Sequence, residues 1–168
     1  MCNCGDNPFR KAQNSALRIL AHREHSVAEL TQKLIRRGYA GDVVQHVIAE
    51  CLRLNYLDDQ RVAQQVLARI KRKGFGIHRV RSELLKRGLA GEESGDDPGE
   101  SMSAADEQIV ARRVSLKKWE SLKHHPDATK RKLRLQRFLR SRGFSDSVVI
   151  EVVAAMDKEE DADLPANN

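Results

Sequence analysis

The chain has 168 residues, of which 40% are hydrophobic, 4% aromatic and 32% charged, with a formal net charge of +6 at pH 7. So few aromatic and so many charged residues favour helices with solvated faces over a packed sheet sandwich. A basic protein of this size can be attracted to nucleic acid or to acidic protein surfaces. No apolar run reaches the length of a signal peptide or a membrane span. We therefore expect a cytoplasmic protein that does not enter the membrane.

The sequence lacks the motifs of a metal site or an active site. Its three cysteines, Cys2, Cys4 and Cys51, form no CxxC pair, which argues against both a disulfide framework and a zinc site. It contains no Gly-rich phosphate loop, nucleophile elbow or Walker-type lysine. The acidic pairs at 58–59 and 96–97 fit a helix cap and a loop better than a catalytic dyad. We expect a protein that is not an enzyme and uses neither cofactor nor metal.

Residues 14–56 are predicted to form a first three-helix repeat after a disordered N-terminus at 1–13. A first helix fits residues 15–24. Ser26 and Glu29 have the spacing of a capping box, in which each side chain satisfies a backbone N–H at the start of a helix. This second helix ends near Gly38, and a third helix follows at about 42–54.

Residues 57–102 are predicted to form a second repeat that lacks its third helix. Asp58 or Asp59 can cap its first helix. The apolar residues of that helix, from Val62 to Ile70, have helical spacing. Gly74 and Gly76 allow the chain to stop that helix and turn. A second helix over residues 77–87 closes at a glycine, and residues 90–102 are dense in Gly and acidic residues, which is typical of a loop.

Residues 103–156 are predicted to form a third repeat, opened by Ser103 as a cap and followed by an acidic disordered tail at 157–168. Its later part matches the first repeat at a constant offset with no gap. The matching positions are Leu135, Leu139, Gly143, Phe144, Val148, Val149, Val152, Val153 and Met156, against Leu30, Leu34, Gly38, Tyr39, Val43, Val44, Val47, Ile48 and Cys51. With Gly88 between them, the glycine corners mark units within the range of helical repeats. The sequence therefore predicts an all-α fold of tandem three-helix repeats.

Basic side chains recur at helical spacing on the solvated faces of these predicted helices. Regularly spaced cations could follow a phosphate backbone and gain affinity from counterion release. Alternatively, they keep the helices soluble and cover apolar neighbours. Arg37, Arg87 and Arg142 are interpreted as structural, because each lies in the last turn of a helix, where a cation complements the dipole. The predicted partner-binding or phosphate-binding residues are Arg69, Arg72, Lys73, Arg79, Lys86, Lys117, Lys118, Lys130, Arg134 and Arg137.

Several motifs resemble those of the RecX family of recombinase regulators. The first repeat carries Ser26, Glu29, Leu30, Leu34 and Gly38 at the family's spacing. The second carries the segment 57–63, the Gly-Phe-Gly corner at 74–76, and Glu83, Leu84, Arg87 and Gly88. The third carries Lys132, Leu135, Phe138, Leu139 and the corner at 142–144. The resemblance covers about residues 12–156, with Val62 in place of the family's usual aromatic residue.

The resemblance implies an elongated, curved, all-helical array that acts as a monomer on the RecA recombinase filament on single-stranded DNA. Such a protein would restrain RecA ATP hydrolysis, filament growth and strand exchange in recombination and DNA repair, with possible direct contact to DNA phosphates. Two alternatives remain open. One is a helix-turn-helix protein that reads duplex DNA through residues 77–87, and the other is an RNA-binding or scaffolding helical array.

Overall fold

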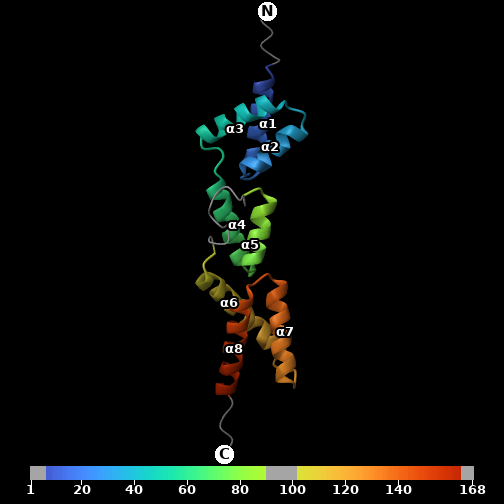
Figure 1. Cartoon of the computed structure of the whole chain (residues 1–168), viewed down its shortest axis with the longest axis vertical. Helices are drawn as coiled ribbons and strands as arrows, with labels where there is room; N and C mark the ends of the chain where they lie inside the picture. The colour runs from blue at the N-terminus through green and yellow to red at the C-terminus, as the bar shows by residue number, and fades with distance from the viewer. Residues whose placement is uncertain (1–6, 90–101, 164–168) are drawn as a thin grey trace, which may run out of the picture. The chain divides into compact units, whose positions relative to one another are not determined.

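The computed structural model describes residues 7–89 and 102–163, and within them the backbone forms eight α-helices and no strand. The helices are α1 (Pro8–His22), α2 (Val27–Arg36), α3 (Gly41–Arg53), α4 (Asp59–Lys73), α5 (Ile77–Lys86), α6 (Ala104–Leu122), α7 (Ala128–Ser141) and α8 (Asp146–Asp163), as labelled in Figure 1. The predicted all-α class is confirmed. Among the described residues, no helix combines the length and the apolar character needed to cross a membrane.

The chain forms two compact units whose boundary falls within α4 and α5. Unit 1 contains residues 1–65 and 84–95, and unit 2 contains residues 66–83 and 96–168. In Figure 1, α1, α2 and α3 lie together in unit 1, and α6, α7 and α8 lie together in unit 2. Each unit therefore contains one group of three helices and parts of α4 and α5.

Helix α1 begins at Pro8, which corrects the expectation of a disordered segment up to residue 13 and a helix start at Ser15. The Asn7 side chain accepts a hydrogen bond from the backbone N–H of Phe9 at 3.0 Å, and Pro8 occupies the first helical position. Proline is favoured there because the first turn needs no N–H donor from it. The small residues Ala12 and Ala16 are fully buried, and Phe9 in the first turn packs against the same core, so this face of α1 is built largely from alanine, which gives a weak hydrophobic signal.

Ser26 begins α2 and also contacts the end of α5. The predicted capping box is confirmed, because the Ser26 hydroxyl accepts from the Glu29 N–H at 3.1 Å and the Glu29 carboxylate accepts from the Ser26 N–H at 3.2 Å. The same hydroxyl donates to the Arg87 carbonyl oxygen. The Asp59 carboxylate accepts from the Val27 N–H at 2.9 Å. Polar contacts thus hold the start of α2 to parts of α4 and α5 that belong to unit 1.

The buried apolar residues of unit 1 come from α1, α2 and α3. Tyr39 and Val43 pack against this core while remaining partly exposed. Its buried members are Ala12, Ala16, Ile19, Leu30, Leu34, Val44, Val47, Ile48, Cys51 and Leu57. Every apolar residue of the first repeat that matches a residue of the third repeat therefore belongs to this core or packs against it.

Unit 2 repeats the same pattern with α6, α7 and α8. Helices α3 and α8 begin at Gly41 and Asp146, which have the same spacing as Gly38 and Gly143. The predicted cap of α6 is confirmed, because the Ser103 side chain accepts from the Asp106 N–H. The matching apolar residues are all buried here, namely Leu135, Leu139, Phe144, Val148, Val149, Val152, Val153 and Met156.

Within unit 2, the corner between α4 and α5 packs directly on the corner between α7 and α8. The Gly76 N–H donates to the Arg142 carbonyl and the His78 N–H donates to the Gly143 carbonyl, each at 3.0 Å. A Cβ atom at Gly76 would lie only 2.4 Å from the Gly143 carbonyl oxygen and from the Phe144 Cα atom. Glycine is required at position 76 because the two backbones leave no room for a side chain.

Glu107 is a buried carboxylate that joins three helices of unit 2. Its Oε1 atom accepts from the Ile77 N–H at 2.9 Å and from the Ser145 N–H at 3.0 Å, and its Oε2 atom accepts from the Ser145 hydroxyl at 2.7 Å. Ile77 begins α5, and Ser145 directly precedes α8. One side chain of α6 therefore satisfies backbone donors at two helix N-termini, where negative charge is favoured.

The acidic C-terminal segment is helical for longer than predicted. Helix α8 continues to Asp163, whereas the sequence predicts a disordered tail from Asp157. Asp157 pairs with Lys132 at 2.7 Å, and adding residues to a formed helix is easier than starting one. Residues 1–6, 90–101 and 164–168, which include most of the predicted loop and the end of the predicted tail, lie outside the described residues. Met102, at the end of the predicted loop, is buried.

Candidate anion-binding pocket

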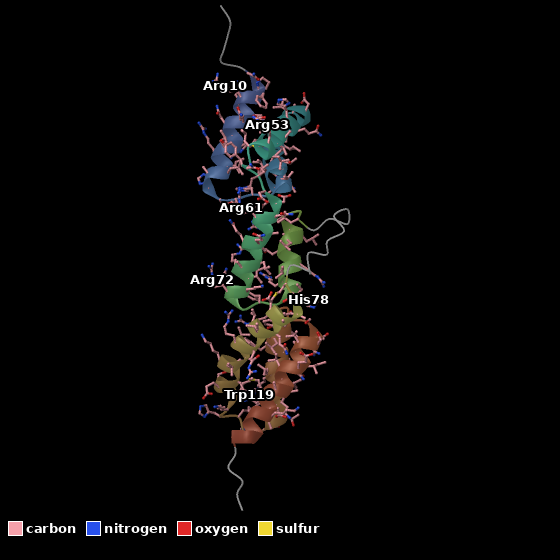
Figure 2. The ribbon with its side chains drawn as sticks, turned by 90° about the vertical axis from the view of Figure 1, so that its left-hand side faces the viewer. Arg10, Arg53, Arg61, Arg72, His78 and Trp119 are labelled. Atoms are coloured by element: carbon pink, nitrogen blue, oxygen red, sulfur yellow. The ribbon has the colours of Figure 1, made fainter. Side chains whose placement is uncertain are left out.

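A pocket of about 470 Å³ in unit 2 is lined by six cations and by no acidic residue. It lies where the C-terminal end of α4 meets α6 and α7. Its cationic residues are Arg72, Lys73, Arg113, Lys117, Lys118 and Arg142, and the remaining lining residues are Gly74, Val114, Ser121 and Phe138. We call this the unit 2 basic pocket. Figure 2 shows Arg72 near the end of α4, with its side chain directed away from the ribbon.

Helical spacing and one close backbone approach build this pocket. Arg113, Lys117 and Ser121 recur every fourth residue along α6, so they share one face of that helix. Gly74 has a φ of +75°, which ends α4, and a Cβ atom there would lie 2.5 Å from the Val114 Cγ1 atom. The end of α4 therefore packs directly against α6, which brings the cations of both helices together.

Two of the six cations are engaged with the C-terminal end of α4. The Arg142 guanidinium donates to the carbonyl oxygens of Lys73 and Gly74 at 3.2 and 3.1 Å. The Arg113 guanidinium donates to the carbonyl oxygen of Lys71. Carbonyls at a helix C-terminus have no partner within the helix and carry partial negative charge. Both arginines therefore help to hold the pocket together as well as lining it.

The remaining cations have no carboxylate partner among the residues that the structure describes. Arg72, Lys73 and Lys117 are exposed, and Lys118 lies over the Phe138 ring, with its Nζ atom 5.7 Å from the ring centroid. Cations this close together repel one another unless an anion or counterions screen them. The pocket is thus suited to bind an anionic group.

Three aromatic rings of unit 2, including Phe138 in the pocket lining, lie beside cations of the same unit. Arg142 lies 5.3 Å from the Phe75 centroid and 4.7 Å from the Phe138 centroid. Arg131 lies 5.9 Å from the centroid of Trp119, which is labelled on α6 in Figure 2. Binding of single-stranded nucleic acid usually requires exposed rings for stacking, and these rings are used within the protein instead.

The structure brings four of the ten predicted binding residues into this pocket and places the other six elsewhere. Arg72, Lys73, Lys117 and Lys118 line it. Arg69 pairs with Glu83 at 2.7 Å, and Lys130 pairs with Asp127 at 3.3 Å. The Arg79 guanidinium lies 5.7 Å from the Phe75 centroid. Arg134 and Arg137 are exposed on α7 outside the pocket, and Lys86 is exposed in unit 1.

Sequence reasoning missed Arg113 and gave Arg142 only a structural role. Arg113 precedes Lys117 by one helical turn, so the spacing of cations along α6 could have identified it. The three arginines at the glycine corners contact other helices of their own unit. Arg37 donates to the Ser15 hydroxyl, Arg87 lies 3.9 Å from Glu29, and Arg142 reaches α4.

The described part of the chain contains no group of three or more His, Cys, Asp or Glu side chains placed to hold a metal ion. Chemically, the geometry of the unit 2 basic pocket supports recognition of negative charge by hydrogen bonding and Coulombic attraction. Guanidinium groups can bind phosphate or carboxylate groups through two hydrogen bonds, and lysines act as point charges.

Comparison with known proteins gives consistent results along the chain. Residues 12–51 match the family model for the first three-helix domain of RecX, and residues 105–153 match that for its third three-helix domain. The chain is 34% identical over 140 residues to the regulatory protein RecX of Pelodictyon phaeoclathratiforme, covering 83% of this chain and 84% of the relative. It is 33% identical over 145 residues to the regulatory protein RecX of Legionella pneumophila, covering 84% of this chain and 92% of the relative.

Solved structures show the same fold. The crystal structure of RecX from Lactobacillus salivarius matches with a TM-score of 0.78 at 17% sequence identity, covering 90% of this chain and 97% of that chain. A crystal structure of a regulatory protein RecX matches with a TM-score of 0.70 at 22% identity, covering 86% and 71%. These likenesses support the helical architecture described above.

Proposed function

Because the chain belongs to the RecX family of regulatory proteins, we propose that it regulates the RecA recombinase by binding the RecA–DNA filament. In this proposal it is a cytoplasmic monomer without catalytic activity of its own, and it restrains RecA ATP hydrolysis, filament growth and strand exchange. Family membership supports the regulatory role, and the resemblance noted in the sequence supports RecA as the partner.

The observation that carries the binding mode is the unit 2 basic pocket, where six cations meet without a carboxylate. We propose that it takes either a backbone phosphate of the filament DNA or an acidic side chain of RecA. Arg72, Lys73 and Lys117 are its best candidates for direct contact, because all three are exposed and none pairs with an acidic side chain in the described part of the chain. Phosphate contacts of this kind gain free energy from counterion release.

The helix-turn-helix alternative is disfavoured by the environment of the first turn of α5. A recognition helix contacts base edges through its N-terminal residues. Here the Ile77 N–H donates to the buried Glu107 carboxylate, and the His78 N–H donates to the Gly143 carbonyl. Ile77 itself is only 7% exposed. The first backbone donors of α5 and the Ile77 side chain are therefore engaged within unit 2, which leaves only outward side chains such as His78 and Arg79 for contact with a DNA groove.

The DNA-dependent ATPase of RecA, measured with substoichiometric amounts of this protein, tests the proposal. We expect the wild-type chain to slow ATP hydrolysis. The double variant Arg72→Ala with Lys117→Ala should need about tenfold more protein for the same effect, because two charge-assisted contacts are removed.

The matched control removes two exposed cations of α7, Arg134→Ala with Arg137→Ala, which changes the net charge equally outside the pocket. We expect it to inhibit almost as well as the wild type. If this control inhibits less well than the Arg72→Ala, Lys117→Ala variant does, the binding surface lies on α7 instead. An unchanged ATPase rate with the wild-type chain would contradict the regulatory proposal itself.

A further inference from the structure

A second basic pocket, of about 680 Å³, lies within unit 1 between α1 and α2. Its lining includes Arg18 and His22 from α1, His25 from the connection, and Lys33 and Arg36 from α2, with no acidic residue. None of these residues was predicted as a binding residue. We call this the unit 1 basic pocket.

His25 holds Lys33 at this pocket without neutralising its charge. His25 is 2% exposed, and its Nδ1 atom lies 2.9 Å from the Arg23 carbonyl oxygen, while its Nε2 atom lies 2.7 Å from the Lys33 Nζ atom. A carbonyl oxygen can only accept, so Nδ1 must carry the proton and Nε2 must accept from the ammonium group. Lys33 is therefore fixed in position by an uncharged acceptor rather than by a carboxylate.

Other cations at this pocket also lack neutralising partners in the described residues. Arg18 and Arg36 are exposed and form no ion pair there. Arg37, another lining residue, donates to the uncharged Ser15 hydroxyl. Arg23 differs, because its guanidinium binds both carboxylate oxygens of Glu29, at 2.8 and 3.0 Å. Four positive charges thus surround the pocket with no negative charge among its lining residues.

We propose that the unit 1 basic pocket binds an anion that carries phosphate groups. Converging guanidinium groups match the paired oxygens of a phosphate, and a fixed lysine supplies a point charge. The exposed His22 imidazole at the rim can add a hydrogen bond. Such phosphates could come from a nucleic-acid backbone or from a free phosphoanhydride such as pyrophosphate. The proposal rests on unit 1 alone and is independent of the function proposed for unit 2.

Two arginines of α1 provide a matched test. Arg18 lines the pocket, whereas Arg10, labelled on the same helix in Figure 2, does not, and both are exposed. Isothermal titration calorimetry of the full chain, with pyrophosphate and separately with oligothymidylate, compares Arg18→Ala, Arg36→Ala and Arg10→Ala with the wild type. We expect Arg18→Ala and Arg36→Ala each to weaken binding by about three- to tenfold, because each removes a charge-assisted contact, and Arg10→Ala to bind as the wild type does.

The two probes distinguish the sources of the phosphate. Arg18-dependent binding of pyrophosphate supports a free anion, and Arg18-dependent binding of the oligonucleotide alone supports a backbone. The imidazole ¹⁵N resonances of His22 should shift on binding, while those of His78, an exposed histidine of unit 2, should not. Failure of both probes to bind, equal affinity in all three variants, or an unshifted His22 would overturn the proposal.

Discussion

His25 illustrates how a single buried side chain can make stability depend on pH. Burial lowers the pKa of His25 from its usual value, the hydrogen bond from its ring to the Arg23 carbonyl opposes this, and the charges of Arg23 and Lys33 lower the pKa further, while Glu29 raises it. The folded protein therefore keeps this imidazole neutral at a pH where the unfolded chain has already taken up a proton.

We expect the free energy of unfolding to fall as the pH drops below about 6.5, the ordinary pKa of histidine. Below that value the unfolded state binds more protons at position 25 than the folded state does, so protonation favours unfolding. Urea unfolding at a series of pH values between about 7.5 and 5 measures this. The range stays above the acidic region where Glu29, whose pKa Arg23 helps to lower, becomes protonated.

Replacing the imidazole identifies its contribution to this slope. His25→Gln should flatten the dependence of stability on pH, although it also changes the contact with Lys33. His78→Gln, at an exposed position in unit 2, serves as the control and should retain the wild-type slope. A His25→Gln variant with the slope of the wild type would show that another group is responsible.

Single-residue contacts could be predicted from sequence only where both partners are close along the chain. The caps Ser26 with Glu29 and Ser103 with Asp106 were predicted, because a helix start fixes a spacing of three residues. The contacts of Glu107 with Ile77 and Ser145 were not predicted. Helical periodicity tells which face of a helix is buried, but not which backbone donors meet it there.

At the level of elements, the glycine corners determine how neighbouring helices pack. Gly76 touches the backbone of the corner at 143–144, while Gly41, the first residue of α3, has open space within 4 Å of the position that a Cβ atom would occupy. Both glycines lie at the start of a helix, but only at Gly76 does the packing of the neighbouring backbone exclude a larger residue.

We expect Gly76→Ala to lower the free energy of unfolding by about 2 kcal/mol or more, because the added carbon overlaps backbone atoms that cannot rotate away. Gly41→Ala should be neutral or should stabilise by up to about 1 kcal/mol, since alanine restricts the unfolded chain without a clash. Thermal and urea unfolding of both variants measure this. Equal stability of the two would contradict the close approach at Gly76.

Element boundaries were predictable where large apolar residues or strong caps mark them. Helices α2 and α3 lie close to their predicted positions and α6 begins at its predicted cap, whereas α1 starts earlier and α8 ends later than expected. Alanine gives a weak hydrophobic signal although Ala12 and Ala16 are fully buried.

The unit 2 basic pocket could not be predicted, because spacing within one helix aligns Arg113 with Lys117 but does not place them beside the end of α4.

At the level of the whole molecule, the 30 Lys and Arg residues outnumber the 24 Asp and Glu residues. Many cations are neutralised locally, as in the pairs of Arg69 with Glu83 and Lys71 with Asp106. The cations that lack such partners in the described residues include members of the two basic pockets. Net charge therefore predicts attraction to polyanions, but the arrangement of ion pairs determines which cations are available for it.

We expect binding to the RecA–DNA filament to weaken with salt, and the slope of log affinity against log salt concentration to depend on the unit 2 basic pocket. If Arg72 and Lys117 each contact a phosphate, their double alanine variant should reduce the magnitude of that slope by roughly 1.5. Fluorescence anisotropy of labelled protein at several salt concentrations measures it. An unchanged slope with weaker binding would instead indicate contact with protein.

The three hydrogen bonds to the Glu107 carboxylate also restrict the order of assembly during synthesis. Its partners Ile77 and Ser145 are separated from it along the sequence by 30 and 38 residues, one before it and one after it. Ser145 therefore leaves the ribosome well after Glu107. Burying the carboxylate before then would leave part of its hydrogen-bonding capacity unused, at a considerable cost. In a nascent chain halted before residue 145, the region around Glu107 should therefore remain unpacked and accessible to chaperones or proteases until translation resumes.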